Sequence, residues 1–219
     1  MISTGLRNPD FVFDAAEELV ARDGIEALTI RALTKASGIS NGAIYRTFES
    51  RGGLLGRVWM RAERRFLDLL TRLVGDATTQ SRNPLDAVYA AAETSLRYPE
   101  LYPASAALLL TVRREDVVAH PMPREIAEHL RVLHRELADV MSQLAAGLWG
   151  RRDSGAVDLV AACIIELPKW IAIRGGKYSS PMLRDYLRAA VRSVLEVGPP
   201  PLGVGCETEP TPARQGGAA

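Results

Sequence analysis

Side chains that donate hydrogen bonds to anions are concentrated in one short stretch of the chain, between residues 29 and 51. Hydroxyl, amide, phenol and guanidinium groups occur together there, and such groups bind phosphate oxygens and the edges of bases. Small residues within the stretch would let a helix backbone approach such a target closely. We therefore predict contacts to a polyanion from Thr29, Arg31, Ser40, Asn41, Gly42, Ala43, Tyr45, Arg46, Thr47 and Arg51.

Two short helices joined by a tight turn are predicted to position these side chains. Thr29 and Ser40 each suit a helix N-cap, where a side-chain oxygen accepts a hydrogen bond from a backbone N–H group. Gly38 suits the turn between the helices. Ser50 suits the cap of a following long helix, which would place Arg51 beside the target. The second helix is expected to be held across the first by Leu33, Ala36, Ile39 and Ile44.

Charge is distributed unevenly along the chain, although the net charge is only +1. Residues 1–26 carry two arginines and six acidic residues, a net charge of −4, whereas residues 27–65 carry eight basic and two acidic residues, a net charge of +6. A local basic excess in a nearly neutral protein indicates one surface that meets a polyanion. From charge alone, a solvated arginine-rich helix face explains the pattern equally well.

The remaining segments also repeat their apolar residues at the helical period, and we expect an all-α protein of about nine helices. Polar residues 76–83 predict a loop, followed by a helix that begins at Pro84 and closes before Pro99. Pro168 is expected to kink the helix in which it lies. Further helices are predicted from Pro103 to about Arg113, over 125–149, over 153–174 and over 179–197.

Composition predicts a folded protein with a disordered tail. The chain has 219 residues, of which 47% are hydrophobic, enough for a large core. Residues 198–219 are rich in Pro and Gly and are expected to be disordered. Cys163 and Cys206 are interpreted as free thiols, and a cytoplasmic location without membrane insertion is expected. The longest uninterrupted apolar stretch is Leu159–Ile165, far shorter than a membrane-spanning helix requires.

Groups that could catalyse a reaction are not arranged for catalysis. His129 and His134 lie five residues apart, whereas two metal-binding histidines on one helix face are four apart. Cys163 lies in an apolar run, which favours a small buried side chain over a nucleophile. Neither a phosphate-binding loop nor a dinucleotide fingerprint occurs in the sequence. We therefore expect no enzymatic activity, no metal site and no cofactor.

A spaced set of residues indicates the family that this chain resembles. Residues 38–48 follow the pattern Gly-x-Ser-x-Gly-x-x-Tyr-x-x-Phe, with Gly38, Ser40, Gly42, Tyr45 and Phe48 at the specified positions. Together with the surrounding residues 11–55, this pattern resembles the N-terminal domain of the tetracycline-repressor (TetR) family. The arrangement of helices along the rest of the chain agrees with the resemblance more loosely.

Three positions depart from the usual family pattern. Leu33-Thr34 stands where an Ile-Ala pair is common, Arg51 where lysine is usual, and Gly52-Gly53 where acidic residues often follow. Arginine keeps the charge of lysine and can bind a phosphate through two nitrogens. The two glycines should weaken the first turn of the long helix by about 1 kcal/mol each relative to alanine.

The resemblance implies a ligand-responsive transcriptional regulator, most often a repressor. Its fold would comprise a three-helix helix-turn-helix DNA-binding domain over residues 1–50 and a helical effector-binding and dimerisation domain over 51–197. A homodimer would bind a palindromic double-stranded DNA operator and be released by a small-molecule effector. The dimer would form through the helices near 153–174 and 179–197, where a charge introduced at Leu187 should separate the subunits.

The effector is expected to be small and apolar or aromatic, because the central part of the chain offers aromatic residues at helical spacing. The residues that could line an apolar cavity are Phe66, Tyr89, Tyr98, Tyr102, Leu109, Met141, Trp149 and Trp170, although residues at such spacing usually belong to the core. Tyr102 and Trp170 are the two residues that we predict to bind the effector.

Other functions are not excluded by the sequence. The principal alternative is a ligand-independent DNA-binding helical protein, which leaves the long helical segment after the DNA-binding domain unexplained. A second is a protein-interaction module in which the three helices are purely structural, and a third is a helical enzyme. Salt-dependent binding to duplex DNA separates the DNA-binding proteins from the interaction module, and a thermal shift with candidate ligands separates the two DNA-binding proteins.

Overall fold

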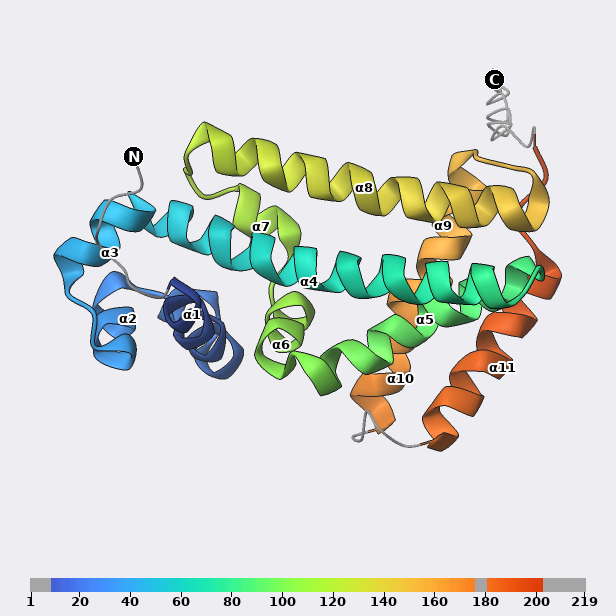
Figure 1. The fold of residues 1–219 in the computed structure, drawn as a ribbon, viewed down its shortest axis with the longest axis horizontal. Helices are drawn as coiled ribbons and strands as arrows, with labels where there is room; N and C mark the ends of the chain where they lie inside the picture. Colours follow the sequence, from blue (N-terminus) through green and yellow to red (C-terminus); the bar gives the residue numbers. More distant parts are fainter. Residues whose placement is uncertain (1–8, 176–180, 203–219) are drawn as a thin grey trace, which may run out of the picture.

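The computed structural model describes residues 9–175 and 181–202, which form helices joined by short connections (Figure 1). The described residues contain no strand, so the predicted all-α class is confirmed. Cys206 and most of the tail predicted to be disordered lie outside the described residues. The elements in chain order are α1 (Pro9–Asp23), the 3₁₀ turn η1 (Ile25–Ala27), α2 (Ile30–Ser37), α3 (Asn41–Phe48), α4 (Arg51–Gln80), α5 (Pro84–Leu101), α6 (Pro103–Thr111), α7 (Arg114–Val118), α8 (Arg124–Trp149), α9 (Ser154–Ala161), the π-helical segment η2 (Ala162–Glu166), α10 (Leu167–Gly175) and α11 (Pro181–Val197).

Helix starts near the N-terminus form where the sequence predicts them. The side-chain oxygens of Thr29, Ser40 and Ser50 accept hydrogen bonds from backbone N–H groups three residues later, over 3.1, 3.3 and 3.0 Å. These bonds satisfy N–H groups that have no partner within the first turn of a helix. The caps therefore fix where α2, α3 and α4 begin.

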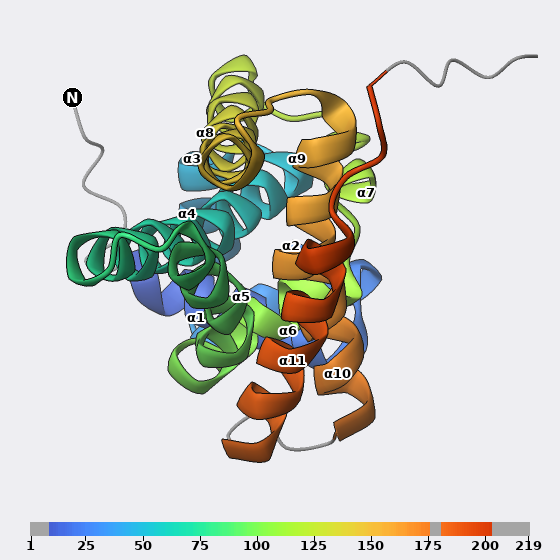
Figure 2. The ribbon, with the colours of Figure 1, turned by 90° about the vertical axis from the view of Figure 1, so that its right-hand side faces the viewer.

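The long helix α4 organises the molecule. It has 30 residues, runs along the long axis, and has α8 packed beside it (Figure 1). The end of the molecule that carries α2 and α3 lies far from α10 and α11, which pack against each other (Figures 1 and 2). None of the described helices combines the length and the apolar character needed to cross a bilayer.

Two boundaries inferred from the sequence are wrong. α4 continues through residues 76–80, for which the sequence predicts a loop, and Thr78 and Thr79 donate their hydroxyls to carbonyls one turn earlier, over 2.8 and 2.9 Å. α5 continues past Pro99 to Leu101. A proline so close to the end of a helix removes only one backbone hydrogen bond. The short helix α7 is a further element that the sequence pattern does not indicate.

Pro168 interrupts its helix as predicted, and the structure shows how the interruption is accommodated. The five residues before Leu167 adopt the π-helical segment η2. Because proline lacks an N–H group, the carbonyl of Ile164 loses its usual partner. That oxygen instead accepts a hydrogen bond from Ser95 Oγ of α5, over 2.7 Å. A side chain thus replaces the missing backbone bond.

Apolar residues form two main cores along α4. The first contains side chains of α1, α2 and α3 together with residues of α6, α7 and α8, whereas the second joins the later part of α4 to α5, α8, α9, η2 and α11. The residues assigned from the sequence to a DNA-binding domain over 1–50 therefore share a core with part of the segment 51–197. A movement of α6 or α8 can be transmitted to α1 through this shared core.

Glycines at the start of α4 allow the connection before α8 to approach closely. A Cβ atom on Gly52 would lie 2.0 Å from the carbonyl oxygen of Pro121, and one on Gly56 would lie 2.7 Å from Cγ2 of Ile126. Both distances are shorter than van der Waals contact. These glycines lower the helix propensity of α4, but the close packing requires residues without a Cβ atom at these positions. The sequence alone does not reveal that requirement.

Replacing Gly52 with alanine is expected to lower the free energy of unfolding by about 1–3 kcal/mol, because the new methyl group collides with a backbone atom that cannot turn away. Gly75, also in α4, serves as the control, since a methyl group there would have no neighbouring atom within 4 Å. Gly75→Ala should instead stabilise the protein by about 0.5–1 kcal/mol through helix propensity. Urea unfolding of both variants measures the difference, and equal effects would contradict the close approach.

Candidate nucleic-acid interface and ligand cavity

α2 and α3 form the predicted helix-turn-helix. Gly38 ends α2 with φ 69°, in the left-handed region that glycine adopts without strain. Leu33 and Ile44 are completely buried and Ile39 packs against the same core, as predicted. Ala36 is exposed, so its predicted role in the helix crossing is wrong.

Most of the predicted contact residues lie on the surface of this unit. Tyr45 is an unusually exposed aromatic residue, with 54% of its surface accessible. Thr47 and Arg51 are half-buried. Ala43 is only 7% exposed, so the structure favours packing over contact with a duplex for this side chain. The exposed members of the set are Thr29, Arg31, Ser40, Asn41, Gly42, Tyr45 and Arg46.

Hydrogen bonds orient several of these polar groups. Thr29 and Ser40 use an oxygen lone pair for capping, which leaves the hydroxyl proton available to an external acceptor. Thr34, one of the departures from the family pattern, donates its hydroxyl to Oδ1 of Asn41 over 2.5 Å. This bond orients the Asn41 amide, whose N–H groups can then donate outward from the start of α3.

Arg51 holds the domain together, a role that its sequence position does not reveal. Its Nε donates to the carbonyl of Leu28 and its Nη2 to the carbonyl of Ile25, each over 2.9 Å. Nη2 also pairs with Glu26 at 3.0 Å. Within the described residues, Nη1 is the guanidinium nitrogen that remains for a phosphate. The main role of Arg51 in the structure is therefore to bind η1 to α4, and its predicted contact to DNA is secondary.

The opposite charges of the first two segments pair with each other. Arg61 of α4 binds Asp14 and Glu17 of α1, with N···O distances of 2.5 and 3.0 Å. Burial opposes the charged form of Arg61, but the hydrogen bonds that Arg61 donates to these carboxylates more than compensate and raise its pKa above the ordinary value. Much of the basic excess read from the sequence is thus neutralised inside the subunit.

Glu17 is the centre of this pairing and is only 1% exposed. Its Oε2 accepts a hydrogen bond from Ser105 Oγ of α6 over 2.7 Å and lies 3.5 Å from Nη1 of Arg65. Arg65 also donates to Ser105, over 3.0 Å. One buried carboxylate therefore joins α1 to both α4 and α6.

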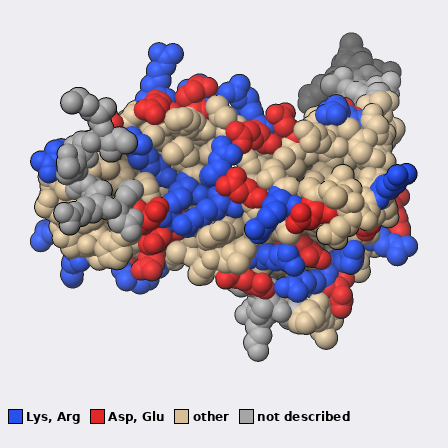
Figure 3. All heavy atoms as spheres, in the orientation of Figure 1, with Lys and Arg blue, Asp and Glu red and all other residues tan. Residues whose placement is uncertain are grey.

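Three basic residues of the helix-turn-helix remain outside such pairs. Within the described part of the chain, Arg31, Lys35 and Arg46 form no ion pair, and all three are exposed. Figure 3 shows Lys and Arg side chains projecting around the end of the molecule that α2 and α3 occupy. The exposed, unpaired basic side chains of segment 27–65 thus lie on the surface expected to face DNA.

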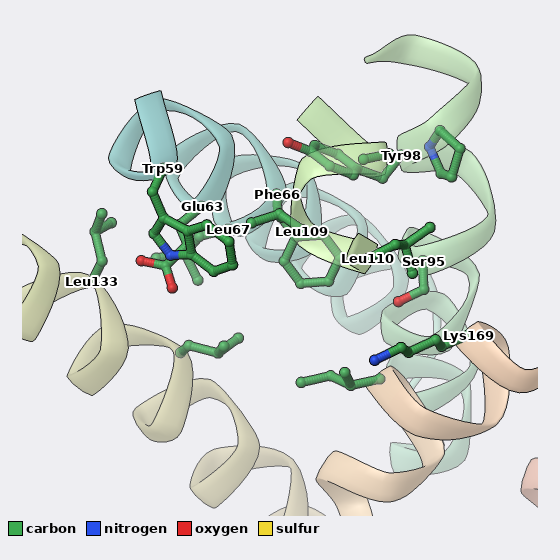
Figure 4. A pocket seen from close by; sticks show the side chains of 14 residues that line it. Trp59, Glu63, Phe66, Leu67, Ser95, Tyr98, Leu109, Leu110, Leu133 and Lys169 are labelled. Atoms are coloured by element: carbon green, nitrogen blue, oxygen red, sulfur yellow. The ribbon is translucent and has the colours of Figure 1, made fainter. Parts of the chain in front are cut away.

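A cavity lies between α4, α5, α6, α8, η2 and α10, with a volume of about 180 Å³ (Figure 4). Most of its surface is apolar, and polar groups are contributed by Glu63, Ser95, Tyr98 and Lys169. The Tyr98 hydroxyl already donates to the carbonyl of Ala62 over 2.7 Å, and burial raises its pKa, so it stays protonated. The lining residues are Trp59, Glu63, Phe66, Leu67, Ser95, Tyr98, Pro99, Ala106, Leu109, Leu110, Leu133, Leu137, Ile165 and Lys169.

The two residues predicted to bind the effector do not line this cavity. Trp170 is 60% exposed on α10, because its neighbour Lys169 is the residue that faces inward. Tyr102 packs beside Tyr98, with ring centroids 5.5 Å apart, and the guanidinium of Arg65 lies 4.8 Å from its ring centre. Residues of α4 and α8 form much of the wall instead, and Trp59 and Glu63 could have been found from their i, i+4 spacing on α4.

α11 presents two different faces. Leu187, Val191 and Leu195 are buried in the second core. Met182 and Tyr186 are 59% and 58% exposed on the other side of the helix. The prediction that a charge at Leu187 separates two subunits is therefore wrong for this residue, because its side chain packs within its own subunit.

The groups considered for catalysis are one buried thiol and two exposed histidines. Cys163 is buried, and burial raises the pKa of its thiol to about 11, so the thiol is protonated at neutral pH. His129 and His134 are both exposed on α8. Across residues 9–175 and 181–202, no three His, Cys, Asp or Glu side chains are grouped to hold a metal ion.

An exposed helix-turn-helix joined to a helical body with an apolar cavity defines a DNA-binding transcription regulator. Residues 12–58 match the family described as bacterial regulatory proteins, tetR family. This match confirms the predicted resemblance over the N-terminal part of the chain, and both that family and the solved structures with a similar fold are transcription regulators, not enzymes. No curated protein matches the sequence significantly.

Solved structures share the fold over nearly their whole length. A TetR-like regulator from Rhodococcus sp. RHA1 is 16% identical, with a TM-score of 0.65 over 90% of this chain and 99% of the other. FadR from Bacillus subtilis in complex with stearoyl-CoA is 15% identical, with a TM-score of 0.61 over 87% and 97%. A regulator from Saccharomonospora viridis in complex with choline is 18% identical, with a TM-score of 0.59 over 85% and 94%. At these identities the comparisons establish the fold.

Proposed function

We propose that the protein is a repressor that binds a palindromic operator as a homodimer in the cytoplasm and is released by a small apolar or aromatic effector. The observation that carries the DNA-binding part is the exposed face of the helix-turn-helix, where Tyr45 and Arg46 project beside Arg31 and Lys35. Tyr45 and the capping hydroxyls would contact phosphates, and Arg46 would reach a base edge.

The homodimer is proposed to form through α10 and α11. On α11, Met182 and Tyr186 are followed at helical spacing by the exposed small residues Ala189 and Ser193, which would let two helices approach closely. Trp170 of α10 is exposed as well. Two subunits joined at this end would present two copies of α3 at the other, as binding to the two halves of a palindrome requires.

The cavity is the proposed effector site, and it favours this function over a ligand-independent DNA-binding protein. Its wall includes Glu63 of α4 and Ala106 of α6. Glu17 of α1 is bound to these same two helices through Arg61 and Ser105. A ligand that shifts α4 relative to α6 would thus change the position of the DNA-binding helices. It would thereby shift the equilibrium between a dimer that binds the operator and one that does not.

Titration of the purified protein against its own upstream intergenic DNA tests the DNA-binding proposal. Selective binding that weakens steeply with salt is expected, because phosphate contacts release counterions. Arg46→Ala should cost about 1–3 kcal/mol for a lost base contact and relax the specificity for that base pair. Circular dichroism should show an unchanged fold, since Arg46 is exposed.

Arg82→Ala provides the matched control. Arg82 is an exposed arginine beyond the far end of α4 and forms no ion pair within the described residues. It should leave both the operator affinity and the salt slope unchanged. If the two variants lose affinity equally, binding follows total charge and the proposed interface is incorrect.

A further inference from the structure

Two buried polar atoms in the cavity lack hydrogen-bond partners within the described residues. These are Nε1 of Trp59 and Oε2 of Glu63, and both residues line the cavity. Trp59 is only 4% exposed. Buried polar groups are normally hydrogen-bonded, because an unpaired one loses its hydration without compensation. Two such atoms in one cavity therefore indicate the chemistry of its ligand.

The two atoms have complementary roles. Trp59 and Glu63 are separated by one turn of α4, which places them on the same face of the helix. Figure 4 shows the indole and the carboxylate together at one end of the cavity. An indole N–H can only donate a hydrogen bond, whereas a carboxylate accepts. A hydroxyl group does both, so a single ligand oxygen can donate to Glu63 and accept from Trp59.

The remaining side of Glu63 is already engaged. Its Oε1 forms an ion pair with Arg114 of α7, whose Nη2 donates to the carbonyl of Leu130 over 2.6 Å. Arg114 supplies the positive charge that this carboxylate requires in a largely apolar setting. A cationic ligand group would therefore gain little attraction, because the pair of Glu63 and Arg114 is already neutral. An anionic group at this end would be repelled by the Glu63 oxygen.

The dimensions of the cavity limit the rest of the ligand. Its volume is about 180 Å³, and side chains such as Phe66, Leu67 and Leu133 make most of its surface apolar. An apolar cavity of roughly 150 Å³ accommodates one benzene ring. The space thus suits one substituted ring better than a long acyl chain.

We propose that the effector is a small one-ring phenol, whose hydroxyl donates to Oε2 of Glu63 and accepts from Nε1 of Trp59 while the ring fills the apolar part of the cavity. This inference rests on the cavity being the effector site proposed above. The hydroxyl of a simple phenol remains protonated at neutral pH, as that of tyrosine does, and so retains the donor that Glu63 requires.

Isothermal titration calorimetry of the full-length protein with 4-ethylphenol and with ethylbenzene tests the proposal. The two probes differ by one hydroxyl, and we expect the phenol to bind at least about tenfold more tightly. Trp59→Phe keeps a ring but removes the donor, so it should reduce the preference for 4-ethylphenol over ethylbenzene about tenfold. Glu63→Gln, which keeps the size of the side chain, should also narrow the difference between the probes.

Three results would overturn the proposal: equal affinity for the two probes, no binding of 4-ethylphenol, or tighter binding of benzoate or tetramethylammonium. Tighter benzoate binding would assign recognition to Lys169, and tighter tetramethylammonium binding would assign it to the aromatic faces. Thermal unfolding verifies that each variant folds, and Glu63→Gln carries the test if Trp59→Phe does not.

Failure of this proposal is distinguishable from failure of the proposed function, because calorimetry needs no DNA. A protein that binds its operator but not the phenol contradicts the ligand chemistry alone. A protein that binds the phenol but no DNA contradicts the regulatory function alone. Release of the operator by 4-ethylphenol but not by ethylbenzene would support both the ligand chemistry and the regulatory function.

Discussion

Glu17→Ala is expected to lower the free energy of unfolding by about 3–5 kcal/mol, because it removes one partner from a buried group of charges. Arg61 and Arg65 would lose a carboxylate that lies within 3.0 and 3.5 Å, and Ser105 would lose the acceptor of its hydroxyl. Water cannot readily replace that carboxylate, since Glu17 is 1% exposed. Urea unfolding followed by circular dichroism measures the loss.

Asp14→Ala is the matched control for this prediction. Asp14 binds the same guanidinium as Glu17, with an N···O distance of 2.5 Å, but its side chain is 57% exposed. Exposed ion pairs are typically worth less than about 1 kcal/mol. Similar losses in the two variants would show that burial of Glu17 does not determine the contribution of this cluster.

The same residue should matter for regulation as well as stability. Glu17 joins α1 to the two helices that wall the cavity, so a variant lacking it should bind the operator more weakly and respond less to an effector. The comparison is made in urea-free buffer at a temperature where circular dichroism shows the variant folded. If the ligand changes the DNA affinity of the folded variant as much as that of the unaltered protein, the movement is transmitted by other residues of the shared core.

Tyr186→Asp should convert the proposed dimer into monomers that remain folded. A buried tyrosine at an interface commonly contributes about 2 kcal/mol or more, and its loss from both subunits would raise the dissociation constant about a thousandfold. The subunit should tolerate the change because Tyr186 is 58% exposed. Sedimentation velocity measures the mass, and DNA binding should weaken in parallel.

The neighbouring substitution Leu187→Asp should have a different outcome. Leu187 is 1% exposed within its own subunit, so an aspartate there would be buried without a partner and should destabilise the fold by about 3–5 kcal/mol or more. Circular dichroism separates the two results. A folded monomer from Leu187→Asp, or a stable dimer from Tyr186→Asp, would contradict the assignment of the two faces of α11.

The helix-turn-helix was predictable because its determinants are local in the chain. Caps at Thr29 and Ser40 and a left-handed turn at Gly38 each depend on residues a few positions apart. Helix periodicity likewise predicts the all-α class. The errors at 76–80 and Pro99 arise where polar residues and a proline are compatible with continued helix, since neither determines by itself where a helix ends.

Amino-acid order was thus sufficient for the class of fold and the helix-turn-helix, because short-range hydrogen bonds and periodic burial specify them. The partners of the charged side chains and the positions of the aromatic rings depended on residues distant in sequence. Arg51 reaches the carbonyl of Leu28, and Glu17 meets Ser105 across 88 positions. Trp59 rather than Trp170 lines the cavity because helix packing, which no local pattern encodes, decides which side of each helix faces inward.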